Sequence, residues 1–229
     1  MQRKITARKV EATIRDQLLI KQRREQIIHA ASQVFSQKGY HQTTIKDICE
    51  VSGLGPGTIY NYVKKKEDIL FLVYDKLTTA LDETLLETIK SHQSPLDQLR
   101  EALRKTIDII WENQDLILLM YQETAALDKE SMYNVLDRES NFVSHMEKIL
   151  QMGRKKGILG NKNIRMAADI IVYLLAFIPL RRWNLRGRFS EKEIKSELID
   201  FVLKALCIRG GGGKIRKADD GRNRKRKIT

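Results

Sequence analysis

The chain has 229 residues, of which 42% are hydrophobic and 31% are charged, and its formal net charge is +13. This length and apolar content suit a small domain joined to a medium-sized one. No apolar run reaches the roughly 18 residues of a membrane-spanning helix. The N-terminus lacks the apolar region of a signal peptide, and there is no CxxC pair. We therefore expect a cytoplasmic protein without membrane contact, metal or cofactor, in which Cys49 and Cys207 are reduced thiols.

The positive charge is concentrated at the two ends of the chain. Residues 1–66 contain 13 Lys and Arg against 5 Asp and Glu, residues 67–208 contain 20 against 22, and residues 209–229 contain 9 against 2. Basic ends on a nearly neutral body suggest a polyanionic partner, because each Lys or Arg near a phosphate releases condensed counterions. Solvated charged faces would give the same composition. We expect residues 1–20 to be a basic extension and 209–229 to be a disordered basic tail.

Apolar residues recur at spacings of three and four, and no long stretch alternates with a period of two, so we predict an all-α protein. The prediction is a three-helix head over residues 21–66 and a larger helical domain over 67–208. The first helix should end at Lys38, before Gly39 in the left-handed conformation. In chain order, the other eight helices are expected at about 45–51, 56–63, 67–91, 95–111, 115–127, 130–156, 164–184 and 190–207.

The two short helices of the head are joined by the glycine-rich turn at residues 52–55, a pattern typical of a helix-turn-helix. The second helix would present its outer side to the major groove of DNA. The first residues on that side are small, so the backbone can approach DNA there. The last ones are polar or aromatic, and their side chains can reach phosphates or base edges. These residues are Pro56, Gly57, Thr58, Tyr60, Asn61 and Tyr62. The sequence leaves open whether Tyr62 belongs partly to the core, and whether Lys64 and Lys65 clamp phosphates or are merely solvated.

The segment TTIKDICEVSGLGPGTIYNYVKKKEDIL resembles the signature of the TetR (TetR/AcrR) family, and the likeness covers about residues 22–75. The residues that match are Thr44, Ile48, Gly53, Gly57, Tyr60, Tyr62, Lys66, Glu67 and Leu70. The departures are Cys49, Ser52, Gly55 and Val63. Gly55 replaces a residue that often caps the second helix, which puts a side-chain phosphate contact there in doubt. The resemblance implies binding of double-stranded operator DNA, with Thr44 and Lys66 added to the contacts above.

The same resemblance implies that residues 67–208 bind a ligand and dimerise. The helices at about 164–207 would pair with those of a second copy, since a palindromic operator requires a twofold dimer. The alternative is that these helices pack only within one subunit. The apolar residues available for such an interface are Ile170, Leu174, Phe177, Ile178, Ile194, Leu198, Phe201, Val202 and Leu206.

A ligand pocket between the helices of this domain is harder to place, because aromatic and Met residues at helical spacing equally suit a plain core. The candidates are Trp111, Leu118, Tyr121, Phe142, Met146, Tyr173, Phe177, Arg182 and Trp183. Four arginines between residues 181 and 188 either stabilise a helix end or form an anion site at the pocket mouth. The run FIPLRRWNLRGRFSEKEI resembles a segment of family members that sense acyl-CoA thioesters. A competing idea is an apolar or cationic drug-like ligand, with Glu123 as the acid that faces it.

We therefore predict a transcriptional repressor that a small apolar or amphiphilic ligand, such as an acyl-CoA thioester, releases from a palindromic operator. The ligand would shift the helix at 67–91 and so change the spacing of the two heads. An enzyme is disfavoured, because the chain has no Gly-rich phosphate loop, GxSxG elbow or HExxH motif. The alternative within DNA binding is a ligand-free architectural or partner-recruiting protein.

Overall fold

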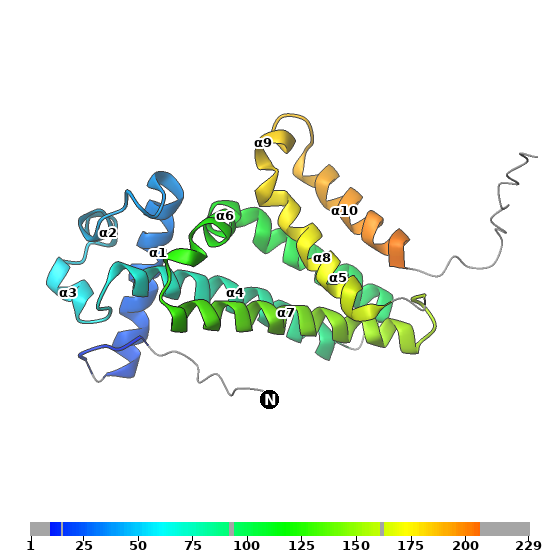
Figure 1. The fold of residues 1–229 in the computed structure, drawn as a ribbon, viewed down its shortest axis with the longest axis horizontal. Coiled ribbons are helices and arrows are strands. Elements are labelled where there is room, and N and C mark those ends of the chain that lie inside the picture. The colour runs from blue at the N-terminus through cyan, green and yellow to red at the C-terminus, as the bar shows by residue number, and fades with distance from the viewer. Residues whose placement is uncertain (1–9, 15, 92–93, 161–162, 207–229) are drawn as a thin grey trace, which may run out of the picture.

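The computed structural model describes residues 10–14, 16–91, 94–160 and 163–206. Within them the chain is all-helical, as predicted, and Figure 1 shows the arrangement. The expected basic tail at 209–229 lies outside the described residues. The helices are α1 (Gln17–Lys38), α2 (Ile45–Ser52), α3 (Pro56–Tyr60), α4 (Lys66–Lys90), α5 (Pro95–Glu112), α6 (Gln114–Glu123), the 3₁₀ turn η1 (Thr124–Ala126), α7 (Lys129–Lys155), α8 (Ile164–Leu180), α9 (Arg182–Leu185) and α10 (Glu191–Leu206).

Capping residues fix most of the helix ends near their predicted positions. The Asp16 carboxylate accepts hydrogen bonds from the free N–H groups of the first turn of α1, and Gly39 ends that helix with φ 75°. Thr44 and Asp47 form a reciprocal capping box at the start of α2. Ser190 forms a similar box with Glu193, whose carboxylate accepts from the Ser190 N–H at 2.7 Å. These local signals explain why the sequence locates the helices well.

Three helices end earlier than predicted, and the one expected over 115–127 stops at Glu123, where the 3₁₀ turn η1 follows. The helix expected over 56–63 stops at Tyr60, because the N–H of Asn61 bonds to the carbonyl of Thr58, three residues back, and the chain then turns. The helix expected over 164–184 divides into α8 and α9 at Arg181. Pro179 lacks the N–H that would continue the helix, so α8 ends one residue later. The prediction is about nine helices, and the described residues contain ten α-helices, because the helix expected over 164–184 is divided.

The long helix α4 connects the two parts of the molecule. Its first turns pack against α1 in the head, and its remainder packs against α5 and α7 in the body. Helix α8 crosses over α5, α6 and α7, and α10 lies against α5 on the outer side of the body (Figure 1). Helix α6 contacts both α1 and α8, so it also joins the head to the body. A shift of α4 or α6 would therefore move the head.

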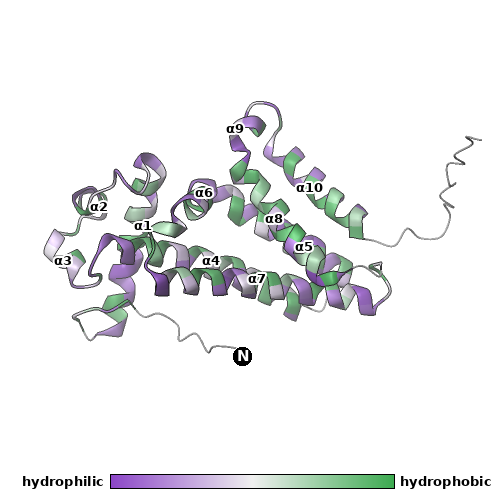
Figure 2. Ribbon diagram, viewed as in Figure 1, coloured by the Kyte–Doolittle hydropathy of each residue, from purple (hydrophilic) through white to green (hydrophobic). Residues whose placement is uncertain are grey.

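One continuous apolar core runs from the head into the body. Figure 2 shows that the hydrophobic faces of the helices point toward one another. The core includes Ile27 and Ile59 in the head and Leu103 and Met146 in the body, all fully buried. Burying each such side chain contributes about 1.5–3 kcal/mol. None of the described helices is long and apolar enough to cross a bilayer.

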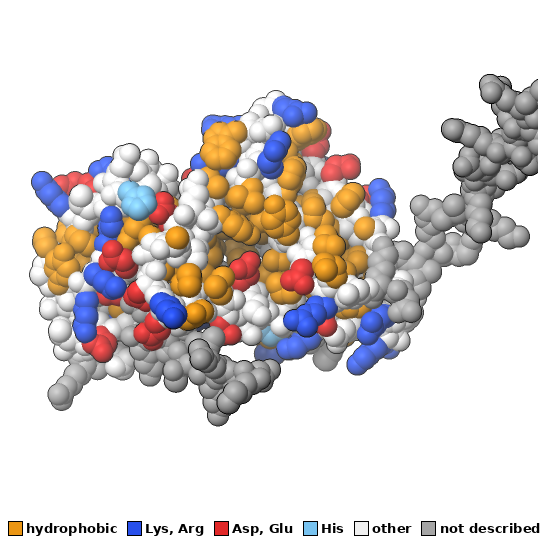
Figure 3. All heavy atoms as spheres, in the orientation of Figure 1, with side chains coloured by type: hydrophobic (Ala, Val, Ile, Leu, Met, Phe, Trp, Pro, Cys, Tyr) orange, Lys and Arg blue, Asp and Glu red, His pale blue; other side chains and the backbone are white. Residues whose placement is uncertain are grey.

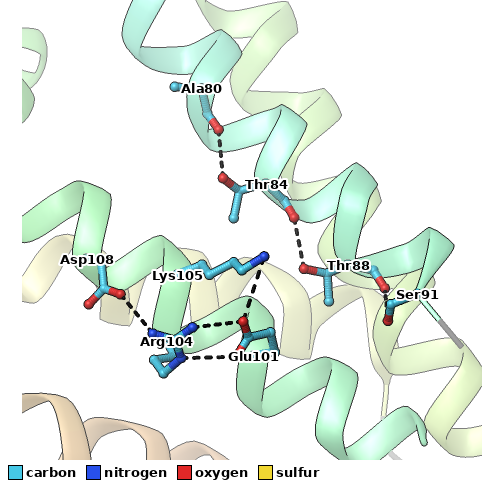
Figure 4. Close-up of polar contacts among 8 residues, drawn as sticks. All are labelled: Ala80, Thr84, Thr88, Ser91, Glu101, Arg104, Lys105 and Asp108. Carbon is cyan, nitrogen blue, oxygen red and sulfur yellow. Dashed lines mark hydrogen bonds and ion pairs between the residues drawn. The ribbon is translucent and has the colours of Figure 1, made fainter. Parts of the chain in front are cut away.

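Polar contacts on the outer surfaces of α4 and α5 are local (Figure 4). On α5, Arg104 pairs with Glu101 at 2.8 Å and with Asp108 at 3.3 Å. On α4, the hydroxyl of Thr84 donates to the carbonyl of Ala80, four residues back, at 2.9 Å. Exposed ion pairs contribute only about 0–1 kcal/mol each, so packing of the apolar faces determines how these helices associate.

Candidate DNA-binding and effector sites

Helices α2 and α3 meet at a tight turn and form a helix-turn-helix. Gly53 ends α2 with φ 69°, a left-handed conformation that other residues rarely adopt, so the chain can reverse within a few residues. The side chains of Ile48, Ile59 and Val63 are fully buried against α1 and α4, which fixes the angle between the two short helices. The opposite side of α3 is left facing outward.

The outward side of α3 holds most of the residues predicted to contact DNA. Pro56, Gly57 and Asn61 are exposed, Thr58 is half-buried, and the Tyr60 side chain is 49% exposed. A Cβ atom added at Gly57 would meet no atom within 4 Å, and the backbone there is not left-handed. The fold itself therefore does not require glycine at this position. A small residue there leaves space for a partner outside the chain.

Thr44 is exposed at the start of α2, beside this surface. Its hydroxyl donates to a carboxylate oxygen of Asp47 at 2.8 Å and accepts from the Asp47 N–H at 3.2 Å. Hydrogen bonds from Lys38 and from the N–H and hydroxyl groups of Thr44 lower the pKa of Asp47 to about 2. Asp47 therefore stays ionised and holds Thr44 in place at the helix end.

Two of the residues predicted to contact DNA have contacts within the head. The side chain of Tyr62 is only 2% exposed and belongs to the core of the head, because the turn after α3 directs it inward. The Lys66 ammonium group donates to the carbonyls of Tyr40 and Thr43, both at 3.0 Å, and lies 4.3 Å from the centre of the Tyr40 ring. Lys66 thus binds the chain between α1 and α2.

The lysines before Lys66 also have partners within the chain. Lys64 forms an ion pair with Glu11 of the N-terminal segment, and Lys65 pairs with Asp128 at the start of α7 at 3.1 Å. Sequence reasoning missed both contacts, because they join residues more than 50 positions apart. Of the predicted basic extension at 1–20, residues 10–14 therefore pack on the head near the end of α3, and residues 16–20 form the cap and first turn of α1.

The body contains a cavity of about 290 Å³ between α4, α5, α6, α7 and α8. Most of its lining is apolar. Its position is set by α8, whose inner side closes the space above α4 and α7. The residues that line it are Thr78, Leu81, Ile110, Ile117, Met120, Tyr121, Thr124, Val135, Leu136, Arg138, Glu139, Phe142, Val172, Leu175 and Ala176.

Of the predicted pocket residues, only Tyr121 and Phe142 line this cavity. Leu118 is buried elsewhere, and Met146 is fully buried in the core one turn beyond Phe142. Tyr173 and Phe177 lie on the outer side of α8, where they are 69% and 41% exposed. The cavity is lined instead by the opposite side of α8. The sequence could not show which side of this helix faces the cavity, because both sides are apolar. The expected acid Glu123 does not line it either.

The cavity has two charged side chains in its wall. Arg138 pairs with Asp75 of α4 at 2.5 Å, so its charge is balanced within the protein. Glu139 forms no ion pair with the described residues, and burial raises the pKa of its carboxyl group. Burial also raises the pKa of the neighbouring Tyr121, with a smaller effect of the Glu139 charge. Glu139 and Tyr121 are therefore the polar groups most available to a ligand.

The end of α6 lies between the cavity and the head. Met120, Tyr121 and Thr124 line the cavity. The carboxylate of Glu123, in the same turn, pairs with the His41 side chain of the head at 2.8 Å. The buried hydroxyl of Tyr74 in α4 donates to the carbonyl of Leu119 in α6 at 2.9 Å. A ligand that displaces this part of α6 would therefore act on head and α4 together.

Comparison with known proteins decides the family. Residues 27–73 match the bacterial regulatory proteins of the tetR family, and residues 92–206 match the tetracyclin repressor-like C-terminal domain. The chain belongs to the TetR family. It is accordingly a helix-turn-helix transcriptional regulator and not an enzyme.

The relatives of this chain are transcriptional regulators, and the similarity extends over most of their length. The transcriptional regulator HbdR of Aromatoleum sp. (strain CIB) is 28% identical over 206 residues, which are 90% of each chain. The fatty acid metabolism regulator protein of Bacillus subtilis (strain 168) is 28% identical over 64% of this chain and 76% of its own. A solved structure of AibR in complex with isovaleryl coenzyme A and operator DNA has a TM-score of 0.67, at 18% identity over 78% of this chain and 97% of that one.

TetR-family regulators dimerise, and this chain has an exposed apolar face on α8 to α10 (Figure 3). The described side chains that are both large and exposed there are Met166, Ile170, Tyr173, Phe177, Trp183, Phe189 and Phe201. Of the residues predicted for the interface, Ile178, Ile194, Val202 and Leu206 are buried within the chain instead, and Leu174 and Leu198 are half-buried. A groove of about 340 Å³ between α8 and α10, lined by Phe177 and Phe201 among others, continues this face.

The predicted arginine cluster lies at a separate cleft of about 490 Å³ beside α9. Trp111, Arg182 and Trp183 line this cleft and not the apolar cavity, so these three predicted residues are reassigned. Arg182 pairs with Asp115 and stacks on the Trp183 ring, 4.9 Å from its centre. Arg186 also lines the cleft and has no ion pair among the described residues. The cleft is thus bordered by a cation without a partner in this part of the chain.

Proposed function

We propose that this TetR-family protein is a dimeric repressor that leaves a palindromic operator when an amphiphilic effector fills the cavity of the body. The observation that carries the proposal is the position of the last turn of α6. One side of this turn lines the cavity with Met120 and Tyr121, and Glu123 in the same turn pairs with His41 of the head. Occupancy of the cavity and position of the head are therefore linked through a few residues.

The proposed DNA surface consists of Thr44 and the outer side of α3, with Pro56, Gly57, Thr58, Tyr60 and Asn61. Small residues at the start of α3 allow the backbone to approach phosphates, and Tyr60 and Asn61 supply donors near base edges or phosphates. Their exposure supports this assignment. Tyr62 is left out because it is buried, and Lys66 because its ammonium group already binds carbonyls of the head.

The proposed dimer uses the exposed apolar face of α8 to α10. Exposed Phe, Tyr and Met side chains on one continuous face are unfavourable in water, and a second copy would bury them. A twofold dimer would hold the two α3 helices about one DNA turn apart, or a multiple of it, which matches a palindromic operator.

For the effector we propose an acyl-CoA thioester with a short acyl chain. A cavity of about 290 Å³ with an apolar lining accommodates an acyl group but not a whole coenzyme A. Arg186 beside α9, which has no ion pair within the described part of the chain, suits phosphate groups outside the cavity. The relatives give further support, since AibR was solved with isovaleryl coenzyme A and another relative is a fatty acid metabolism regulator.

Release from the operator follows from the thermodynamic linkage between effector binding and DNA binding. The effector must bind the cavity more tightly in the conformation whose head spacing does not fit the operator. DNA must then weaken effector binding by the same factor, typically 5–150-fold. A finite factor, at which the effect of the effector saturates, separates this release from simple competition for the DNA surface.

The test is fluorescence-polarisation titration of a duplex selected by the protein from a random library. Isovaleryl, butyryl and palmitoyl coenzyme A are added in turn, with free coenzyme A as the matched control. We expect one acyl-CoA to raise the Kd for DNA at least fivefold, with free coenzyme A inactive. Tight DNA binding that no compound weakens would contradict the proposal and favour a ligand-free architectural role.

A further inference from the structure

The N-terminal segment at residues 10–14 is bound to the head beside the end of α3. Val10 is 8% exposed, so its side chain is part of the core. Its carbonyl accepts a hydrogen bond from the guanidinium group of Arg24 in α1. Another hydrogen bond from Arg24 goes to the carbonyl of Tyr62, at 3.1 Å. Arg24 therefore ties the segment to the turn that follows α3.

Two further contacts hold the segment in register with the end of α3. The Thr13 N–H donates to the carbonyl of Asn61 at 2.9 Å, and Glu11 forms an ion pair with Lys64. The pair balances the charge of Lys64, so this lysine adds little net positive charge near the end of α3. The segment is thus a structured part of the DNA-binding surface.

Thr13 also contacts the side chain of Asn61. Its hydroxyl lies 3.3 Å from the amide oxygen Oδ1 and 3.2 Å from the Asn61 carbonyl oxygen, and it donates to both. Because Oδ1 accepts from Thr13, the N–H groups of Nδ2 are the part of the Asn61 amide left for another partner. Among the described residues nothing accepts a hydrogen bond from Nδ2, and Asn61 is exposed.

We propose that Thr13 is a positioning residue for operator recognition, because its hydroxyl holds the Asn61 amide with its two N–H groups directed at DNA. This inference rests on the proposed contact of Asn61 with DNA. A free asparagine contacts adenine through one donor and one acceptor, whereas an amide presented by its N–H groups favours acceptors such as N7 and O6 of guanine. The base pair opposite Asn61 should therefore be read by its acceptors.

The test compares Thr13→Val with Thr13→Ser in the full-length protein. Valine has nearly the shape of threonine and keeps the backbone bond to Asn61, but it lacks the hydroxyl. Serine keeps the hydroxyl. Binding is measured by fluorescence polarisation to a duplex that the wild-type protein selects from a random library, and to single base-pair substitutions of it. Size-exclusion chromatography and thermal melts confirm that each variant is a folded dimer.

We expect Thr13→Val to weaken binding about three- to tenfold, a loss typical of one hydrogen bond. The preference of the protein for one base should weaken at one base pair in each half-site, and duplexes with adenine at that position should bind relatively better. The slope of log Kd against log salt should stay unchanged, because no phosphate contact is lost. Thr13→Ser should behave as wild type. Unchanged affinity and base preference in Thr13→Val would overturn the proposal.

A double-mutant cycle with Asn61→Ala separates this inference from the proposed function. If Thr13 acts through Asn61, Thr13→Val should have no further effect in the Asn61→Ala protein. A loss from Thr13→Val that persists there would show that Thr13 acts on its own, against the proposal. If Asn61→Ala alone binds DNA normally, the proposed Asn61 contact is itself wrong. If Asn61→Ala weakens binding while Thr13→Val does not, that contact stands and only the role of Thr13 is lost.

Discussion

The side chains of His41 in the head and Glu123 in the body are in direct contact, with Nε2 and Oε2 2.8 Å apart. The two residues belong to different parts of the chain, which also meet through α1, α4 and α6 and through the pair of Lys65 with Asp128. The Glu123 side chain is only 16% exposed, whereas that of His41 is 74% exposed. The Glu123 carboxylate is thus held by the body, whereas the exposed His41 imidazole is free to move away from it when the head shifts.

Replacing Glu123 with Gln should reduce the response to the effector more than it reduces DNA binding. The pair is partly exposed, so its loss alone should change the operator Kd by less than about fivefold. The ratio of Kd values with and without effector should fall toward one. Glu101→Gln, which breaks an ion pair on α5 away from this contact, is the matched control. An unchanged ratio in the Glu123 variant would show that the head is coupled by another route.

Tyr60 and Tyr62 provide a matched pair for the DNA surface. Tyr60→Phe should weaken operator binding about three- to tenfold by removing one hydrogen bond, with no change in the melting temperature. Tyr62→Phe should leave DNA affinity unaltered, because its ring is 2% exposed within the head. Fluorescence polarisation and thermal melts on both variants check this. A loss of affinity in the Tyr62 variant would restore its original assignment to the DNA surface.

The head could be predicted from sequence because its signals are local. The Thr44 capping box, the glycine turn and the spacing of the apolar residues lie within about 25 positions of one another. The surroundings of Tyr62 and Lys66 could not be predicted in the same way, because they come from other segments. The partners of Lys66 are carbonyls near Tyr40, more than 20 residues away. The contact of Thr13 with Asn61 spans 48 positions and has no local signal at all.

The cavity was predicted poorly for a different reason. Its wall is assembled from five helices, and which side of each helix faces the space depends on how they cross. On α8 both sides are apolar, because one faces the cavity with Val172 and the other forms the exposed face with Tyr173. Periodicity identifies a helix with two apolar sides but does not say which side is internal.

Filling the cavity should abolish the response while sparing DNA binding. Val172 is half-buried in the cavity wall, and Val172→Phe would place a ring in the space an acyl chain would take. We expect the operator Kd without effector to change less than twofold and the effect of isovaleryl coenzyme A to disappear. Isothermal titration calorimetry with the same compound should show no binding. Retained release would place the effector site elsewhere, with the cleft beside α9 as the next candidate.

Glu139→Gln should stabilise the protein at neutral pH. Burial raises the pKa of Glu139 in the folded state, so folding becomes less favourable as the pH rises through that pKa and the carboxyl ionises. Water reaches the cavity and screens the charge, so the expected gain in Tm at pH 7 is only about 1–2 °C. Below about pH 4 the carboxyl is protonated in both states, and the gain should vanish. Thermal melts from pH 4 to 8 test the sign; a lower Tm for the variant at pH 7 would show that the carboxylate has a stabilising partner.

Phe201 tests the proposed dimer interface. Its side chain is 60% exposed on α10, within the apolar face of α8 to α10, and Phe201→Glu would place a charge where a second copy is expected to pack. We expect the variant to sediment as a monomer with an unchanged helical signal in circular dichroism. Its operator affinity should fall at least tenfold, because each half-site then binds separately. Leu18→Glu is the control, since Leu18 is 74% exposed on α1 and lies outside this face. If both variants remain dimers at micromolar concentration, the chains associate through a different surface.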